Sequence, residues 1–125
     1  MFNTQKKTRV ETLICGELRT AKEQYGETFN SLHEAYAVAL EELEEASENV
    51  DMCKHCYEYV WNRIKSDEEK KIIVASLNRT RINAVEAIKE LAQFAAMIDK
   101  TLETLEKEKE ASTEKISVVQ KGDEQ

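Results

Sequence analysis

Residues 31–66 read SLHEAYAVALEELEEASENVDMCKHCYEYVWNRIKS, and they predict one long amphipathic helix. Their apolar residues recur at spacings built from three and four, which is the spacing of one helix face. These residues are Tyr36, Leu40, Leu43, Val50, Tyr57, Trp61 and Ile64. Ser31 and Glu34 form the S-x-x-E pattern of a capping box at its start. At about 1.5 Å per residue the helix would span about 50 Å. An equally long element must therefore pack on it.

A second long helix is expected after the first. Ser66 and Glu69 repeat the capping-box pattern, which predicts a sharp turn around residues 65–67. From there to about Lys107, apolar residues again step by threes and fours: Ile73, Leu77, Ala84, Ile88, Leu91, Ala95, Ile98, Leu102 and Leu105. A short turn makes the two helices antiparallel, so residues whose numbers sum to roughly 132 are expected at the same level.

The two ends of the chain differ in character. Residues 4–25 carry apolar residues at helical spacing and predict a shorter helix that stops at Gly26. Residues 108–125 are dominated by charge and predict a mobile tail. The expected organisation is a single all-α helical domain over residues 1–107, made of a short helix and a long antiparallel helical hairpin.

Composition narrows the class of protein. The chain has no proline and 3 glycines among 125 residues, which favours an all-α fold without hairpin turns of β type. Its net charge of -7 disfavours direct nucleic-acid binding, because lysine and arginine must neutralise phosphates. The sequence contains no apolar run long enough for a membrane span and no signal-peptide core. Its 3 cysteines, an odd count, are expected to be thiols in the cytoplasm.

Four glutamates are expected to meet on one face of the helix pair. Glu42 and Glu90 have numbers that sum to 132, and Glu45 and Glu86 sum to 131, so each pair should share a level. Carboxylates brought together repel unless a cation holds them, and oxygen ligands of this kind suit magnesium. The alternative is that the glutamates form a solvated face with no bound metal.

The same acids carry a family resemblance. Residues 41–45, EELEE, have the form EExxE, and residues 90–93, ELAQ, have the form ExxQ. Together they resemble the EExxE…ExxD signature of the MazG-like all-α nucleoside triphosphate pyrophosphohydrolases. The resemblance implies magnesium ligands at Glu42, Glu45 and Glu90, with Glu41 as a ligand or base and Glu86 as a substitute ligand. Gln93 stands where the family has aspartate and would be a neutral, weaker ligand at the cofactor site. The interval between the two motifs is longer than in the family.

Two further segments suggest other relationships and sites. Residues 29–46, FNSLHEAYAVALEELEEA, and residues 93–100, QFAAMIDK, are similar to small proteins from phages and prophages of Gram-positive bacteria. That group has no established function. His33 lies in a first helical turn, where free backbone amides favour an anion such as phosphate, although an exposed first-turn histidine is the simpler explanation. Cys53, His55 and Cys56 form C-x-H-C, but Cys53 and His55 point about 160° apart on a helix, which argues against zinc.

Three functions remain open from the sequence. The first is magnesium-dependent hydrolysis of a nucleoside triphosphate between the α and β phosphates. The second is a phage protein that binds a nucleotide or a cyclic-nucleotide immune signal without hydrolysing it, in the host cytoplasm. The third is a coiled-coil scaffold that binds a protein partner.

Self-association is expected in every case. A second apolar stripe through Val38, Phe94 and Met97 would stay exposed in a single chain. This predicts a homo-oligomer, at least a dimer, with the acidic patch near a subunit boundary.

Overall fold

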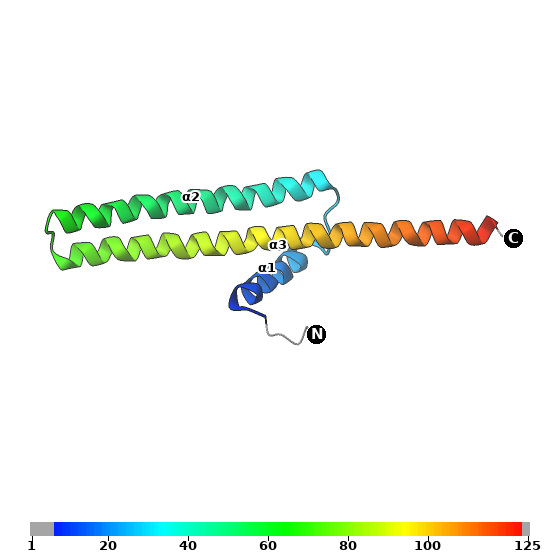
Figure 1. Ribbon diagram of the computed structural model, residues 1–125, viewed down its shortest axis with the longest axis horizontal. Helices are drawn as coiled ribbons and strands as arrows, with labels where there is room; N and C mark the ends of the chain where they lie inside the picture. Colours follow the sequence, from blue (N-terminus) through cyan, green and yellow to red (C-terminus); the bar gives the residue numbers. More distant parts are fainter. Residues whose placement is uncertain (1–6, 124–125) are drawn as a thin grey trace. The chain divides into compact units, whose positions relative to one another are not determined.

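The computed structural model describes residues 7–123 and contains three helices and no strand within that range (Figure 1). The helices are α1 (Arg9–Tyr25), α2 (Leu32–Lys65) and α3 (Lys70–Asp123). The all-α class expected from the sequence is therefore confirmed. The chain forms two compact units, one comprising Val38–Phe94 and the other comprising the residues up to Ala37 together with those from Ala95 onward.

Helix α1 begins and ends at residues with clear local causes. Thr8 is its N-cap: the Thr8 hydroxyl accepts from the backbone N–H of Glu11 at 3.1 Å, and the Glu11 carboxylate accepts from the N–H of Thr8 at 3.2 Å. This reciprocal pair is a capping box that sequence analysis missed. The helix ends at Gly26, as expected, where φ is 99° and the N–H donates to the carbonyl of Lys22. A positive φ of this kind favours glycine.

At the start of α2, one of the two expected capping hydrogen bonds is made by Asn30 and not by Ser31. The Ser31 hydroxyl accepts from the N–H of Glu34 at 3.1 Å, as the capping box requires. The Glu34 carboxylate, however, accepts from the N–H and the side-chain amide of Asn30, at 3.1 and 3.3 Å, rather than from the N–H of Ser31. The helix therefore starts where the sequence predicts, with Asn30 supplying half of the cap.

The turn between α2 and α3 is formed differently from the expectation. Asp67 has φ of 52°, its N–H donates to the carbonyl of Ile64, and the N–H of Glu68 donates to the carbonyl of Arg63. These two hydrogen bonds form a Schellman motif with Asp67 in the left-handed position. The capping-box assignment of Ser66 was wrong, because its N–H donates to Asn62 and completes the end of α2.

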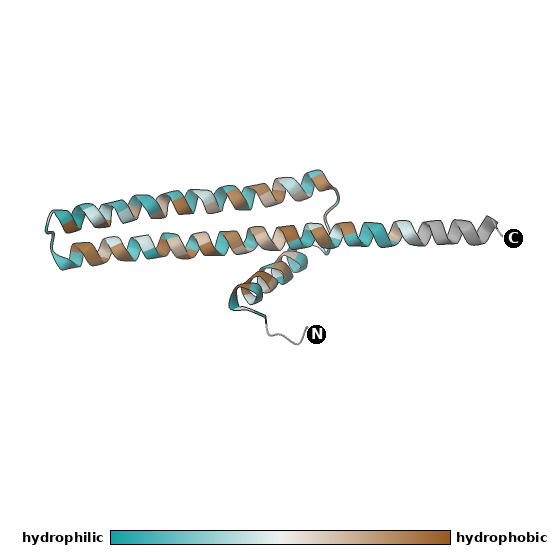
Figure 2. Cartoon of the chain, in the orientation of Figure 1, coloured by the Kyte–Doolittle hydropathy of each residue, from teal (hydrophilic) through white to brown (hydrophobic). Residues whose placement is uncertain are grey.

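Helix α3 is longer than predicted, since it continues past Lys107 to Asp123. The extension, rich in Glu and Lys, contains no proline, and no glycine before Gly122, so nothing in its local sequence stops a helix. The division at Lys107 and the mobility of residues 108–125 stay predictions. No helix among residues 7–123 combines the length and the apolar character needed to cross a bilayer, and Figure 2 shows hydrophobic and hydrophilic residues interspersed along α2 and the coloured part of α3.

Within Val38–Phe94, α2 and α3 contact each other through small and polar side chains. The Cys53 thiol donates to the carbonyl of Thr80 at 3.6 Å, and the Asn83 amide donates to the Cys56 sulfur at 3.5 Å. The buried or half-buried positions of this seam follow a seven-residue repeat on each helix. On α2 they are Ala39, Glu42, Ala46, Asn49, Cys53, Cys56, Val60 and Arg63, and on α3 they are Ile73, Ser76, Thr80, Asn83, Ala87, Glu90 and Phe94.

The large apolar residues expected at this seam are mostly exposed. Leu43 is 40% exposed, Tyr57 63%, Trp61 56%, Leu77 44% and Leu91 46%. The expected assignment was wrong by one position of the repeat, because Ala39 and Ala46 allow a closer approach of the two helices than leucine or tyrosine would. The predicted exposed stripe was also wrong: Val38 and Phe94 are half-buried and, in the other unit, Met97 is 7% exposed.

The unit that joins both ends of the chain is organised around Thr104 and Lys100. The Thr104 hydroxyl accepts from the backbone N–H of Phe29 at 3.1 Å, although the two residues are 75 positions apart. The Lys100 ammonium, on a side chain only 2% exposed, lies 4.3 Å from the centre of the Phe29 ring. Lys22 pairs with Glu103 at 2.5 Å, so α1 and α3 are joined by an ion pair.

Candidate functional site

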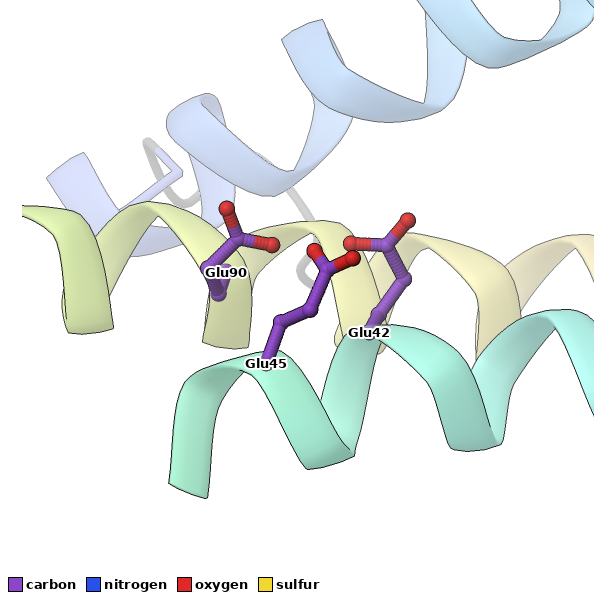
Figure 3. A group of neighbouring side chains, drawn as sticks. All are labelled: Glu42, Glu45 and Glu90. Carbon is purple, nitrogen blue, oxygen red and sulfur yellow. The ribbon is translucent and has the colours of Figure 1, made fainter. Parts of the chain in front are cut away.

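Three carboxylates meet in the Val38–Phe94 unit. Glu42 and Glu45 lie three residues apart on α2, and Glu90 lies on α3, with the three side chains directed toward one another (Figure 3). One carboxylate oxygen from each lies within 4.8 Å of the others. Glu42 and Glu90 are half-buried, whereas Glu45 is exposed. We call these three residues the acidic cluster.

The positions of the acidic cluster follow from the repeat. Glu42 and Glu90 both occupy seam positions, where helices usually carry apolar residues. Glu45 lies beside the seam on α2, one helical turn after Glu42, so the two side chains are neighbours on the helix surface. The two half-buried carboxylates thus lie among the other half-buried polar residues of the seam, such as Asn49 and Asn83.

Gln93 closes the acidic cluster on the α3 side. With its amide nitrogen turned toward the carboxylates, Gln93 donates to Glu42 Oε2 at 2.8 Å and to Glu90 Oε2 at 3.0 Å. One neutral amide therefore joins a carboxylate from each helix. The sequence singled out Gln93 only as a weak metal ligand, and its role as a donor was missed. The available signal was its place three residues after Glu90 on the same helix face.

Two members of the acidic cluster, Glu45 and Glu90, hold protons more tightly than isolated glutamates do. The pKa of Glu45 is raised above the ordinary value of 4.5, first by its hydrogen bond with Glu90 and then by burial and neighbouring negative charge. Burial is the main cause of the raised pKa of Glu90; its hydrogen bond with Glu42 raises it further, and the one with Glu45 lowers it. A pattern in which carboxyl groups share hydrogen bonds is typical of closely spaced acids that cannot all ionise freely.

The donor set suits a hard divalent cation. Magnesium prefers carboxylate oxygens and keeps several waters, so three carboxylates at the edge of a helix pair leave room for waters or phosphate oxygens. The exposed position of Glu45 keeps the acidic cluster open to solvent on that side. A cation there would also offset the negative charge of the neighbouring carboxylates.

Not every predicted site residue joins the acidic cluster. Glu86 was expected to pair with Glu45, but Glu45 instead hydrogen-bonds Glu90, and Glu86 is exposed outside the group. Glu45 therefore contacts the residue four positions after Glu86 on α3. Glu41 is exposed one turn before Glu45, and its charge helps to raise the pKa of Glu45. His33 is exposed in the first turn of α2, outside the acidic cluster.

The C-x-H-C segment does not form a zinc site. Cys53 and Cys56 both face α3, where they contact Thr80 and Asn83. His55 is exposed, and its ring meets Tyr59 edge-on with centroids 6.1 Å apart. The expectation that one metal could not collect all three side chains agrees with these contacts.

Comparison with known proteins adds no family assignment. No protein-family model matches the chain, and no curated protein or solved structure matches it.

Proposed function

We propose that this chain is a magnesium-dependent nucleotide pyrophosphohydrolase of MazG-like type, acting as an antiparallel helical hairpin within an oligomeric bundle in the cytoplasm. One observation carries the proposal. The two acidic segments that resemble the EExxE and ExxD motifs are far apart in the sequence, and they contribute Glu42, Glu45 and Glu90 to a single group of carboxylates. Such convergence is what a shared metal requires.

The proposed chemistry assigns a role to each residue. Glu42, Glu45 and Glu90 hold the cation, which neutralises charge on the triphosphate and orients it. Glu41, exposed beside Glu45, accepts a proton from the attacking water. The water oxygen bonds to the α phosphorus, and the bond from that phosphorus to the bridging oxygen breaks. The products are a nucleoside monophosphate and pyrophosphate.

A second candidate function is capture of a nucleotide or cyclic nucleotide without turnover. The contacts of Gln93 favour it, because an amide that donates to both Glu42 and Glu90 partly satisfies these carboxylates without a cation. A neutral residue at this position also lowers the charge available to hold magnesium. The two functions differ in one measurable property, which is release of pyrophosphate.

The first experiment measures pyrophosphate release from a panel of nucleoside triphosphates, with magnesium and with EDTA. We expect Glu42→Gln and Glu90→Gln to abolish release, while Glu86→Gln, the same change on an exposed residue outside the acidic cluster, leaves it unchanged. The change Gln93→Asp should preserve or raise activity, because it adds a charged oxygen ligand.

The outcomes separate the candidates. Magnesium-dependent release that is lost in both cluster variants and kept in Glu86→Gln supports the enzyme. A rise in melting temperature with a nucleotide or cyclic dinucleotide, without any release, supports capture. If neither magnesium nor any nucleotide shifts the melting temperature, and the cluster variants behave like Glu86→Gln, the acidic cluster is a solvated face and both functions are rejected.

A further inference from the structure

The Val38–Phe94 unit carries many exposed large apolar side chains beside its seam. On each helix these residues lie at positions that adjoin the seam on the same side. They are Leu43, Val50, Tyr57, Trp61 and Ile64 on α2, and Val74, Leu77, Ile88 and Leu91 on α3. We call this surface the apolar face. All nine side chains are between 37% and 63% exposed.

The apolar face contains more large apolar side chains than the seam that joins the helices. The buried seam residues of this unit are Ala39, Ala46, Cys56, Val60 and Ala87, of which only Val60 is a large apolar residue. Burial of apolar area is the main source of stability, at about 25 cal/mol per Å². The unit therefore keeps most of its large apolar area outside its own core. Single-chain proteins seldom leave so extensive an apolar surface in water.

We propose that the apolar face is the interface with a second copy of this chain. Leu43, Val50, Tyr57 and Ile64 follow one another every seven residues, and Leu77 and Leu91 belong to the equivalent repeat on α3. A seven-residue repeat is the pattern of helices that supercoil around further helices. Two such pairs placed face to face bury both patches in one four-helix core, and twofold symmetry requires the same patch on each subunit.

Charge selects one arrangement of the two copies. Glu44, Asp51 and Glu58 repeat every seven residues along the outer side of α2, and Arg81 lies among the apolar residues of α3. Stacking α2 on the partner's α2 would bring two rows of acids together. Stacking α2 on the partner's α3 places Asp51 beside Arg81 of the partner subunit, because the numbers 51 and 81 sum to 132 and so lie equally far from the turn. We therefore infer that each α2 packs on the α3 of the partner subunit.

The acidic cluster lies on the other edge of the helix pair. Helix geometry places Leu43 and Leu91 on one side of the seam, and Glu45 and Gln93 on the opposite side. The proposed interface therefore leaves the acidic cluster open, whereas the sequence predicted the acids near a subunit boundary. The interface does not depend on the proposed function, and its test is independent of nucleotide chemistry.

The decisive experiment mixes two charge-reversed variants, Asp51→Arg and Arg81→Asp. In a homodimer of either variant, both symmetry-related contacts between positions 51 and 81 join like charges. We expect the dimer Kd of each to rise about tenfold, which corresponds to about 1.4 kcal/mol. In the mixed dimer both contacts join opposite charges, so analytical ultracentrifugation or native mass spectrometry should show the mixed species in excess over either homodimer.

A second pair of variants tests the face itself. Val50→Asp should convert the dimer to a monomer, whereas Met52→Asp, the same change at an exposed residue on the cluster side, should leave the dimer intact. Circular dichroism confirms that both variants remain helical. Two results would overturn the interface. One is a wild-type chain that stays monomeric at a protein concentration about 100 times the detection limit of the measurement. The other is a dimer that persists in the Val50→Asp variant. Absence of excess mixed dimer would overturn the assignment of α2 to the partner's α3.

Discussion

Neutralising Glu90 should stabilise the protein when no divalent cation is present. Oxygens of Glu90 and Glu42 lie within 4.8 Å, and both side chains are half-buried. Two unit charges at that distance repel by about 1 kcal/mol even at the dielectric constant of water. Glu90→Gln removes this repulsion and keeps an oxygen that accepts from Gln93. We therefore expect the free energy of unfolding, measured with urea at pH 7 in EDTA, to rise by about 1 kcal/mol.

Magnesium should reverse the ranking of the two proteins. A ligand bound only to the folded state stabilises it by about 2.7 kcal/mol at a concentration of 100 times its Kd. The wild type should gain this stability, and Glu90→Gln should not. The matched control is Glu86→Gln, which removes the same charge from an exposed position outside the acidic cluster and should change neither measurement. If Glu90→Gln and Glu86→Gln give equal unfolding free energies in EDTA, the reasoning about repulsion fails.

The Glu90→Gln variant should also differ from the wild type in how its stability depends on pH. The raised pKa values of Glu45 and Glu90 mean that the folded protein binds protons more tightly than the unfolded chain. This contribution to stability is fully present below the ordinary value of 4.5 and is lost as the pH rises through the raised values. In EDTA, the wild type should therefore lose stability over that window. Glu90→Gln should show a flatter profile, and an unchanged slope would contradict the cause assigned to the shifts.

Three further changes test the fold by urea unfolding. Asp67→Gly should stabilise the protein by about 0.5–1 kcal/mol, because Asp67 holds a positive φ that costs most residues about 1–2 kcal/mol; a loss would argue against the left-handed turn. Thr104→Val leaves the buried N–H of Phe29 without its acceptor and should cost about 1–3 kcal/mol, whereas Thr113→Val, at an exposed site, should cost little. Ala46→Leu should cost about 1–3 kcal/mol through overpacking at a side chain 1% exposed, and a neutral result would show that the seam is loose.

The sequence predicted the parts of the fold that depend on local signals. Ser31 and Gly26 marked helix ends because a hydroxyl cap and a residue free to take positive φ act over a few residues. The proximity of Glu42 and Glu90 was predicted because a short turn determines which levels of the two helices lie side by side. These predictions need only helix geometry and the position of the turn.

The sequence did not show which of two neighbouring stripes is buried. Ala39 and Ala46 repeat every seven residues, and so do Leu43 and Val50, so periodicity alone cannot rank them. Ranking by residue size chose the leucine stripe, whereas the helices pack through the alanine stripe, where their backbones approach more closely. The donor role of Gln93 was missed because it depends on the orientation of one amide between two helices.

The hydrogen bond between Phe29 and Thr104 has a consequence for how the chain folds. It joins residues 75 positions apart, whereas the contacts between Cys53 and Thr80 and between Cys56 and Asn83 each span 27. Closing a longer loop costs more chain entropy, and contacts distant in sequence slow folding. The segment around the Asp67 turn can close first and removes most of the intervening residues from the longer loop. Residues beside the turn should therefore show higher φ-values in the folding transition state than Phe29 and Thr104.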